Sequence, residues 1–414
     1  MSLNFLPGRP NDTRQTICQG YWQNHTIFTY CSGNNLIILS NKFTRLQTIY
    51  LEQDCIAVDI NPENGFIAVA VGNILQIYKP LHQVMKNPKW AQCCQIYHDP
   101  SRINCIRWGK DNEVAVGSDY LSFWKVKDVF GEYKPVLLWN KKQAKPVYVV
   151  AVADNSQLIA SFGKYDHTVK LWKRISISGE QVIFTLSLLP HPETVTAIRW
   201  KKTSSKLTDN KSYAMYTLCS DKKLRIWLCF EADAAHLTVQ CWGTIPLSDN
   251  QKYCLILDNW IINELYERSK KLKKDTTKEY AFTNSDIIML GEDNHDIFDI
   301  YELDNISSNP PRPMVKKQLL SRRITHPAFV AAPTFFYFAE LQPFDDSAST
   351  VSLIIHDIQG VIRQSLVDVP KFLDQDLSIT KLGDMVLHLE HKFTGHNKSI
   401  QKLARSSDGE ALLT

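Results

Sequence analysis

Short apolar runs separated by polar turns recur along the whole chain. Three neighbouring units share one order: an apolar run, a turn, a second apolar run, a turn that contains Asp, and a third run that carries a Trp. The units open with INCIRW (103–108), VYVVAVA (147–153) and TVTAIRW (194–200), and they close with GSDYLSFWKV (117–126), KYDHTVKLWKR (164–174) and CSDKKLRIWLC (219–229). Continuous apolar runs of this length between turn signals are typical of buried strands. Each unit therefore predicts three consecutive strands, with a fourth strand in the segment before the next unit.

Weaker units follow the same plan on both sides of these three. The positions that close the third run lie near residues 39, 78, 124, 172, 227, 301 and 356. A repeat of about 40–45 residues with four strands per unit is the signature of WD-type propellers, and the longer spacings here indicate loop insertions. The sequence therefore predicts an all-β fold, a seven-bladed WD40-type β-propeller over residues 1–394.

Aromatic and acidic residues at repeated positions are the expected structural anchors of the blades. These anchors are Tyr78, Trp124, Trp172, Trp227, Tyr301, Asp119, Asp166 and Asp221. The turn Asp is expected to accept hydrogen bonds from the turn and from a histidine, which pairs Asp166 with His191 or His167 and Asp119 with His98. Because the pattern recurs in each unit and buried polar groups need partners, a structural network is favoured over a catalytic site.

The last residues carry the opening of one more unit. Gly395 and His396 precede an apolar run and an Asp-Gly turn. We expect residues 395–414 to be the start of a second propeller, with a closing strand of the first ring as the alternative. Since a partial blade buries its apolar face poorly, the sequence also suggests a piece of a longer protein.

Two insertions interrupt the repeat. The segment 257–280 predicts a helix with a basic end, and its possible partner-binding residues are Trp260, Lys270, Lys271, Lys273 and Lys274. A docking helix and a solvated helix on the rim both fit this pattern, and a lysine run is more often a solvated face. The segment 305–323 contains Pro310, Pro311 and Pro313 and predicts a rigid basic loop.

Composition narrows the classes of function. The net charge is +4 from 47 basic and 43 acidic residues, which is too small an excess to indicate a nucleic-acid partner. The ten cysteines form no CxxC pair and lie mostly in apolar runs, so we expect reduced, buried thiols in a reducing compartment. The N-terminus lacks the apolar core of a signal peptide, and no apolar run approaches 18 residues, so a cytoplasmic protein with indirect membrane association is expected.

Motifs that carry chemistry are missing from the sequence. It contains no GxxxxGK[ST], GxSxG, HExxH or GxGxxG, and its histidines lack metal-ligand spacing. We therefore expect no catalytic, cofactor-binding or metal-binding residues, and a protein that acts by binding other proteins.

Several non-repeat strings carry a more specific resemblance. The opening MSLNFLPGRPND, the run WQNHTIFTYCSGNNLIILSNKFTRLQTIY (22–50), NPKWAQCCQIYHD (87–99) and GSDYLSFWKVKD (117–128) resemble the N-terminal region of the large WD-repeat subunit of the RAVE complex. RAVE is the regulator of the vacuolar and endosomal proton-pumping ATPase, and its animal relatives are the rabconnectin and DmX-like proteins.

The resemblance implies a non-catalytic scaffold that promotes reassembly of the V1 and Vo sectors of the pump, and hence vacuolar acidification. The implied partners are the small RAVE subunit, the Skp adaptor, and V1 and Vo subunits, met at endosomal and vacuolar membranes. Two alternatives stay open. The chain could be a generic WD-repeat adaptor, such as a substrate receptor of a ubiquitin ligase. An enzyme on a propeller scaffold would need converging ionisable groups in the channel, which the sequence does not indicate.

Overall fold

The structure is a computed structural model of the protein. The residues it describes are 8–22, 25–40, 43–81, 88–98, 101–176, 182–202, 212–231, 236–249, 251–258, 261, 285–292, 297–304, 314–323, 337–338, 340–343, 350–356, 361–368, 386–392, 404–405 and 412–413.

The strands group into successive antiparallel sheets, each built from consecutive strands. The first sheet contains β1 (Ile17–Trp22), β2 (His25–Ser32), β3 (Asn35–Ser40) and β4 (Arg45–Tyr50), and the second contains β5 (Cys55–Ile60), β6 (Ile67–Val71), β7 (Ile74–Leu81) and β8 (Lys89–Tyr97). The third contains β9 (Cys105–Trp108), β10 (Glu113–Gly117), β11 (Tyr120–Val129) and β12 (Glu132–Lys142), and the fourth contains β13 (Val147–Val152), β14 (Leu158–Gly163), β15 (Thr168–Ser176) and β16 (Val182–Pro190).

The later sheets continue this order with one addition. The fifth contains β17 (Val195–Trp200), β18 (Ser212–Cys219), β19 (Lys223–Glu231) and β20 (Leu237–Pro246). The sixth contains β21 (Gln251–Leu257), β22 (Asp286–Glu292), β23 (Ile297–Asp304) and β24 (Met314–Arg323), and β25 (Tyr337–Phe338) pairs in parallel with β21. The next contains β26 (Glu340–Pro343), β27 (Thr350–His356), β28 (Val361–Asp368) and β29 (Val386–Lys392), and β30 (Ala404–Arg405) pairs with β31 (Leu412–Leu413).

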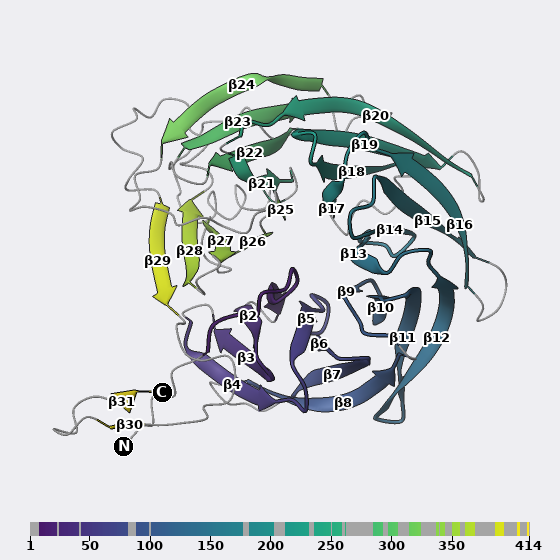
Figure 1. The fold of residues 1–414 in the computed structure, drawn as a ribbon, viewed down its shortest axis with the longest axis vertical. Coiled ribbons are helices and arrows are strands. Elements are labelled where there is room, and N and C mark those ends of the chain that lie inside the picture. The colour runs from purple at the N-terminus through teal and green to yellow at the C-terminus, as the bar shows by residue number, and fades with distance from the viewer. Residues whose placement is uncertain are drawn as a thin grey trace, which may run out of the picture.

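The sheets stand around a common axis as the blades of a propeller (Figure 1). In each four-stranded sheet the first strand lies nearest the axis and the fourth lies at the rim, and in the sixth sheet β25 lies on the axis side of β21. The pair β30–β31 lies outside the ring (Figure 1). Strand β1 contacts β26, so the first and last large sheets lie side by side. The predicted all-β propeller is confirmed. Because much of the chain after residue 258 lies outside the described residues, the count of seven blades and the boundary at residue 394 stay predictions.

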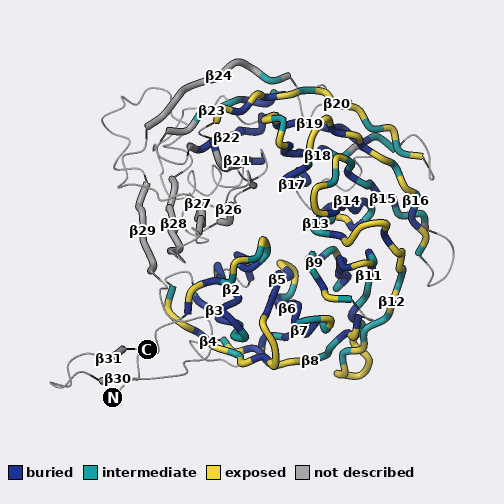
Figure 2. Tube along the Cα trace, viewed as in Figure 1, coloured by how far each residue is buried: buried dark blue, intermediate teal, exposed yellow. Residues whose placement is uncertain are grey.

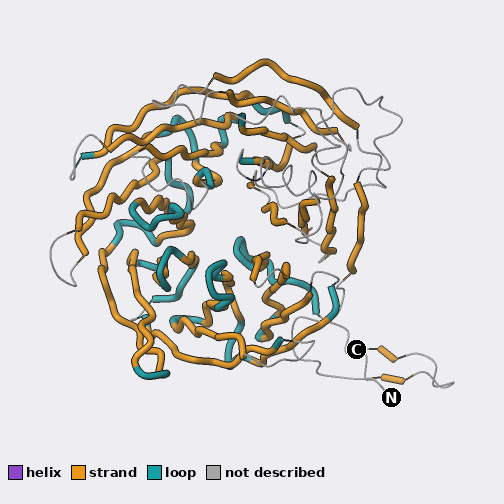
Figure 3. The backbone as a smooth tube through the Cα atoms, turned by 180° about the vertical axis from the view of Figure 1, so that it is seen from behind, coloured by secondary structure: helices purple, strands orange, loops and turns teal. Residues whose placement is uncertain are grey.

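Burial explains why the apolar runs are continuous. Every residue of β6, β10 and β14 is buried, because these strands face a neighbouring blade on each side. The rim strands β16 and β20 instead mix exposed and buried positions, and Figure 2 shows this change from axis to rim. Where the structure describes them, the loops between consecutive strands are short (Figure 3).

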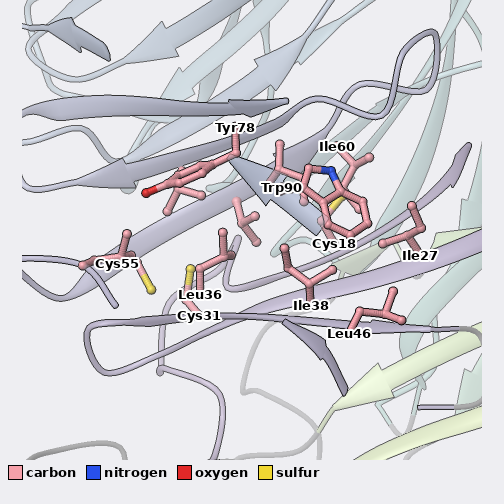
Figure 4. Close-up of a cluster of buried hydrophobic side chains, with 14 of the residues drawn as sticks. Cys18, Ile27, Cys31, Leu36, Ile38, Leu46, Cys55, Ile60, Tyr78 and Trp90 are labelled. Atoms are coloured by element: carbon pink, nitrogen blue, oxygen red, sulfur yellow. The ribbon is translucent and has the colours of Figure 1, made fainter. Parts of the chain in front are cut away.

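Cysteines fill the space between the first two blades. Cys18, Cys31 and Cys55 pack there with aliphatic side chains and Trp90 (Figure 4). All ten cysteines are free and seven are buried, as the apolar runs around them predicted. Burial raises the pKa of the Cys105 thiol to about 12, so this group stays protonated and packs as a small apolar side chain.

Two expectations differ from the structure. Residues Met314–Arg323 form β24, the rim strand of their sheet, so the loop expected over 305–323 is wrong for this part. The prolines end at Pro313, and the following residues have free backbone N–H groups that pair with β23. The position near residue 356 lies at the end of β27, a second strand, whereas the other closing positions lie in third strands.

Candidate protein-interaction site

The tryptophan anchors serve hydrogen-bond networks inside the blades. The Trp172 indole N–H donates to Ser161 Oγ at 3.0 Å, and the Trp227 indole donates to Thr217 Oγ1 at 2.9 Å. His191 extends the second network, since its Nε2 lies 2.9 Å from the same Thr217 oxygen and its Nδ1 lies 3.0 Å from the Leu189 carbonyl. This arrangement suits the neutral Nδ1–H tautomer, and burial lowers the pKa of His191. The recurring network is structural.

The expected Asp–His pairs are replaced by hydroxyl–His pairs. His98 contacts Ser122 Oγ at 2.8 Å and Ser118 Oγ at 3.3 Å rather than the carboxylate of Asp119. The carboxylate of Asp166 accepts from the Gly163 N–H at 2.9 Å and pairs with Lys145 at 2.8 Å. The histidine ring reaches inward to a hydroxyl on a buried strand, whereas the turn Asp stays at the blade edge. The order of residues in the sequence does not reveal that the His98 ring is buried while the Asp119 side chain is exposed.

The other anchors have varied roles. Asp221 pairs with Arg225, which lowers the pKa of the Asp221 carboxyl. The Tyr78 hydroxyl donates to Gln76 at 2.8 Å. Tyr301 packs half-buried against the core. Trp124 is also half-buried, and its indole N–H has no hydrogen-bond partner among the described residues. Trp124 therefore anchors its blade by packing alone.

Ion pairs with a buried acid join neighbouring blades, and the pattern of the repeats did not predict them. Asp59 on β5 accepts from the Trp108 backbone N–H at 2.7 Å and pairs with Arg107 at 3.1 Å, both on β9. Arg199 pairs with Asp258 at 2.8 Å in the same way between later blades. The sequence does carry a signal for the pair of Asp59 and Arg107. Asp59 lies in the otherwise apolar strand CIAVDI, and an acid in a buried strand is rare unless it is paired.

The channel side of the ring is partly covered by the segment before β1, residues 11–16. The Gln15 side chain bonds both backbone groups of Ile106 on β9, with the Ile106 N–H donating at 2.9 Å. The Gln15 carbonyl accepts from Val58 on β5. Arg14 lies with its guanidinium 4.9 Å from the Tyr148 ring and donates to the Thr196 carbonyl of the fifth blade. This segment therefore connects inner strands of several blades.

Replacing Gln15 by alanine is expected to lower the free energy of unfolding by about 1–3 kcal/mol, because the Ile106 N–H and carbonyl both lose their side-chain partner. Urea denaturation followed by tryptophan fluorescence measures this change. The control is Asp12→Ala on the same segment, where the side chain is exposed and a change under 0.5 kcal/mol is expected, roughly the scatter of surface substitutions. Equal stability of the two variants would show that the segment does not hold the ring.

Exposed apolar side chains gather at the rim rather than in the channel. The rim of the third to fifth blades carries Leu137 on β12, Ile183, Leu186 and Leu188 on β16, and Trp242 on β20, and Phe130 lies beside Val129 at the turn between β11 and β12. Elsewhere in the described residues, the exposed large apolar or aromatic side chains are Tyr50, Leu81, Tyr97 and Tyr165. Leu186 is opposite Trp172, which packs 5.0 Å from Trp139 of the third blade. The rim of the third to fifth blades therefore carries a group of exposed apolar side chains that a partner can cover.

The predicted partner-binding residues Trp260, Lys270, Lys271, Lys273 and Lys274 lie outside the described residues. Of the segment 257–280, the structure describes Leu257, Asp258 and Ile261, and all three are buried. The expected helix and its partner therefore stay predictions.

Within the described ranges, no group of three or more His, Cys, Asp or Glu side chains is placed to hold a metal ion. In the same part of the chain, no helix has the length and apolar character needed to cross a bilayer.

Comparison with known proteins finds a repeat family and a similar regulator. The WD domain, G-beta repeat family matches residues 136–173, which run from β12 to β15. The chain is 55% identical over 416 aligned residues to the "Regulator of V-ATPase in vacuolar membrane protein 1" of Saccharomyces cerevisiae, covering all of this chain and 30% of that protein. The chain is similar over its whole length to this V-ATPase regulator. The resemblance inferred from the sequence is confirmed.

Less similar proteins match over shorter ranges. The protein of the same name from Schizosaccharomyces pombe is 26% identical over 62% of this chain and 20% of its own length, and human DmX-like protein 1 is 24% identical over 60% of this chain and 10% of its own length. The chain thus spans 30% or less of these regulators and DmX-like proteins. Among solved structures, Sqt1 of Chaetomium thermophilum has a TM-score of 0.51 with 11% identity, covering 86% of this chain and 84% of that one, which supports the propeller fold.

Proposed function

We propose that this chain is a non-catalytic scaffold region of the RAVE complex, and that it promotes assembly of the V1 and Vo sectors of the vacuolar proton-pumping ATPase. The observation that carries the proposal is the 55% identity, over the whole chain, to a protein named as a regulator of that pump. The proposed partners are the small RAVE subunit, the Skp adaptor, and V1 and Vo subunits. The proposed location is the cytoplasm, with peripheral association at endosomal and vacuolar membranes.

The polar groups of the described blades support binding rather than catalysis. The buried acids Asp59, Asp258 and Asp286 are paired with basic groups of the same or a neighbouring blade. The buried His191 is occupied by Thr217 and the Leu189 carbonyl. A catalytic acid or base needs access to substrate. These acids and His191 instead contact partners within the ring.

The proposal is tested by affinity purification of the tagged full-length protein together with a measurement of vacuolar pH. The wild-type protein is expected to recover pump and RAVE subunits, and its removal is expected to raise vacuolar pH. A folded protein that recovers neither group of subunits, or whose loss leaves vacuolar pH unchanged, would contradict the proposal. Recovery of a ubiquitin-ligase core in their place would favour the adaptor alternative.

The insertion is tested in the same purification by changing Lys270, Lys271, Lys273 and Lys274 to Gln. Deleting all of 257–280 is unsuitable, because Asp258 is buried and pairs with Arg199. If the lysines contact an acidic partner, the substituted protein recovers that partner several-fold less well while keeping its melting temperature. Lys222 and Lys223, in the turn into β19, are the matched control pair.

A further inference from the structure

The hairpin of β11 and β12 extends past its own blade. The last residue of β11 that pairs with the inner neighbour β10 is Lys125, opposite Glu113. Pairing between β11 and β12 continues to Val129 opposite Glu132. Residues 127–134 therefore form a two-stranded arm, defined here as the hairpin arm, which projects from the ring as an exposed loop near β8 (Figure 2).

The base of the hairpin arm is braced on the second blade. The Tyr133 ring lies 5.3 Å from the Phe66 ring in an edge-on contact, and the Lys79 ammonium lies 4.9 Å over the same Tyr133 ring. At the tip, the Gly131 N–H donates to Asp128 Oδ1 at 2.8 Å. The arm is thus held in one conformation before any partner arrives, which lowers the entropic cost of binding.

The tip carries a residue that its local structure disfavours. Phe130 and Gly131 form a two-residue turn in which both φ angles are positive, at 54° and 88°. Such a turn favours Asn followed by Gly, because a bulky side chain is strained at positive φ. Phe130 is also fully exposed, at 104% of its reference area, so no packing within the described chain offsets the strain of its positive φ.

An aromatic side chain that is strained and also fully exposed indicates a binding role. Val129 beside it is 37% exposed and extends the apolar tip. The arm carries Lys127 and Lys134 against Asp128 and Glu132, so it has no net charge, and Lys134 pairs with Glu132 at 3.3 Å. A segment that docks on anionic lipid needs a basic excess, which the arm lacks.

We propose that the hairpin arm is a docking element whose Phe130 inserts into an apolar pocket of a protein partner. The pocket has a rim without strong net charge, in keeping with the neutral arm. The inference rests on the proposed function for the choice of partner, which is one of the two sectors of the proton pump. Phe130 is the buried anchor of that interface, and the balanced charges beside it set the orientation.

The test measures binding of the full-length protein to purified V1 sector, purified Vo sector, and vesicles of phosphatidylcholine and phosphatidylserine. The variant is Phe130→Asn, which suits the turn and is expected to leave the melting temperature unchanged or raise it. Loss of a central aromatic anchor is expected to weaken binding to one sector about 30-fold or more. Phe130→Leu keeps an apolar tip and is expected to retain most of the affinity.

The matched control is Tyr97→Asn, which removes another exposed aromatic residue. Tyr97 lies at the end of β8 beside the start of β7, and thus on the opposite face of the ring from the hairpin arm. Its affinity is expected to equal that of the wild type. Equal binding by Phe130→Asn, or a loss confined to the vesicles, overturns the inference and leaves the proposed function intact. Failure of the wild-type protein to bind either sector overturns the proposed function and this inference with it.

Discussion

Asp59→Ala is expected to lower the free energy of unfolding by about 2–4 kcal/mol, because the buried Trp108 N–H loses its acceptor and Arg107, whose side chain is 36% exposed, loses a charged partner. Asp59 is 2% exposed. Its carboxylate accepts from the Trp108 N–H at 2.7 Å and from Arg107 at 3.1 Å, and it also contacts the Cys18 thiol at 3.4 Å. These contacts join the first three blades at one point, so the loss acts on blade packing and not on a single strand.

Urea denaturation of Asp59→Ala and of Asp59→Asn separates the loss of the acceptor for the Trp108 N–H from the loss of the negative charge opposite Arg107. The amide keeps an acceptor for the Trp108 N–H but loses the charge that balances Arg107, so an intermediate loss is expected. Asp54→Ala provides the control, since Asp54 lies five residues earlier and is exposed. A loss below about 1 kcal/mol for Asp59→Ala would mean that the blades hold together without this carboxylate, as expected of a surface ion pair.

Thr217→Val is expected to cost about 2–4 kcal/mol with almost no change in side-chain volume. The Thr217 oxygen lies 2.9 Å from both the Trp227 indole nitrogen and His191 Nε2, and the residue is fully buried. Valine leaves both ring nitrogens without a partner, and each buried unsatisfied group costs about 1–3 kcal/mol.

The reverse comparison is Thr217→Ser, which keeps the hydroxyl and removes one methyl group, at a cost of about 1 kcal/mol. Stability is measured by urea denaturation, with the tryptophan fluorescence of the fifth blade as the probe. If Ser and Val at position 217 destabilised the protein equally, the network of Trp227 and His191 would contribute by packing and not by hydrogen bonding.

The sequence predicted the strands well where burial alone decides the pattern. IAVAV (67–71) and LIASFG (158–163) are buried along their whole length, so each appears as an unbroken apolar run. Trp172 and Trp227 were placed correctly because the same strand position recurs in successive units. Strand β24 was not predicted because its polar runs, KKQ and SRR, are typical of a loop. A strand at the rim also carries polar residues, because one of its faces is exposed to solvent.

The contacts between blades and the interaction site were harder to predict, because neither follows from the pattern within one unit. Asp59 and Arg107 meet across two blades, 48 residues apart, and no periodicity within one unit reveals such a pair. Phe130 appeared in the sequence as one more aromatic residue in a strand-rich region. Its significance depends on a positive φ and full exposure, which only three-dimensional structure supplies.

The segment before β1 has a consequence for the order of folding during synthesis. Arg14 reaches the Thr196 carbonyl, a partner 182 residues later in the chain. At about 5–20 residues per second, a ribosome needs roughly 10–40 s to make that stretch. During that interval Arg14 has no access to Thr196, while the blades encoded between these two residues are synthesised and fold. The contact between Arg14 and Thr196 therefore forms only after four blades and the first strand of the fifth have been synthesised.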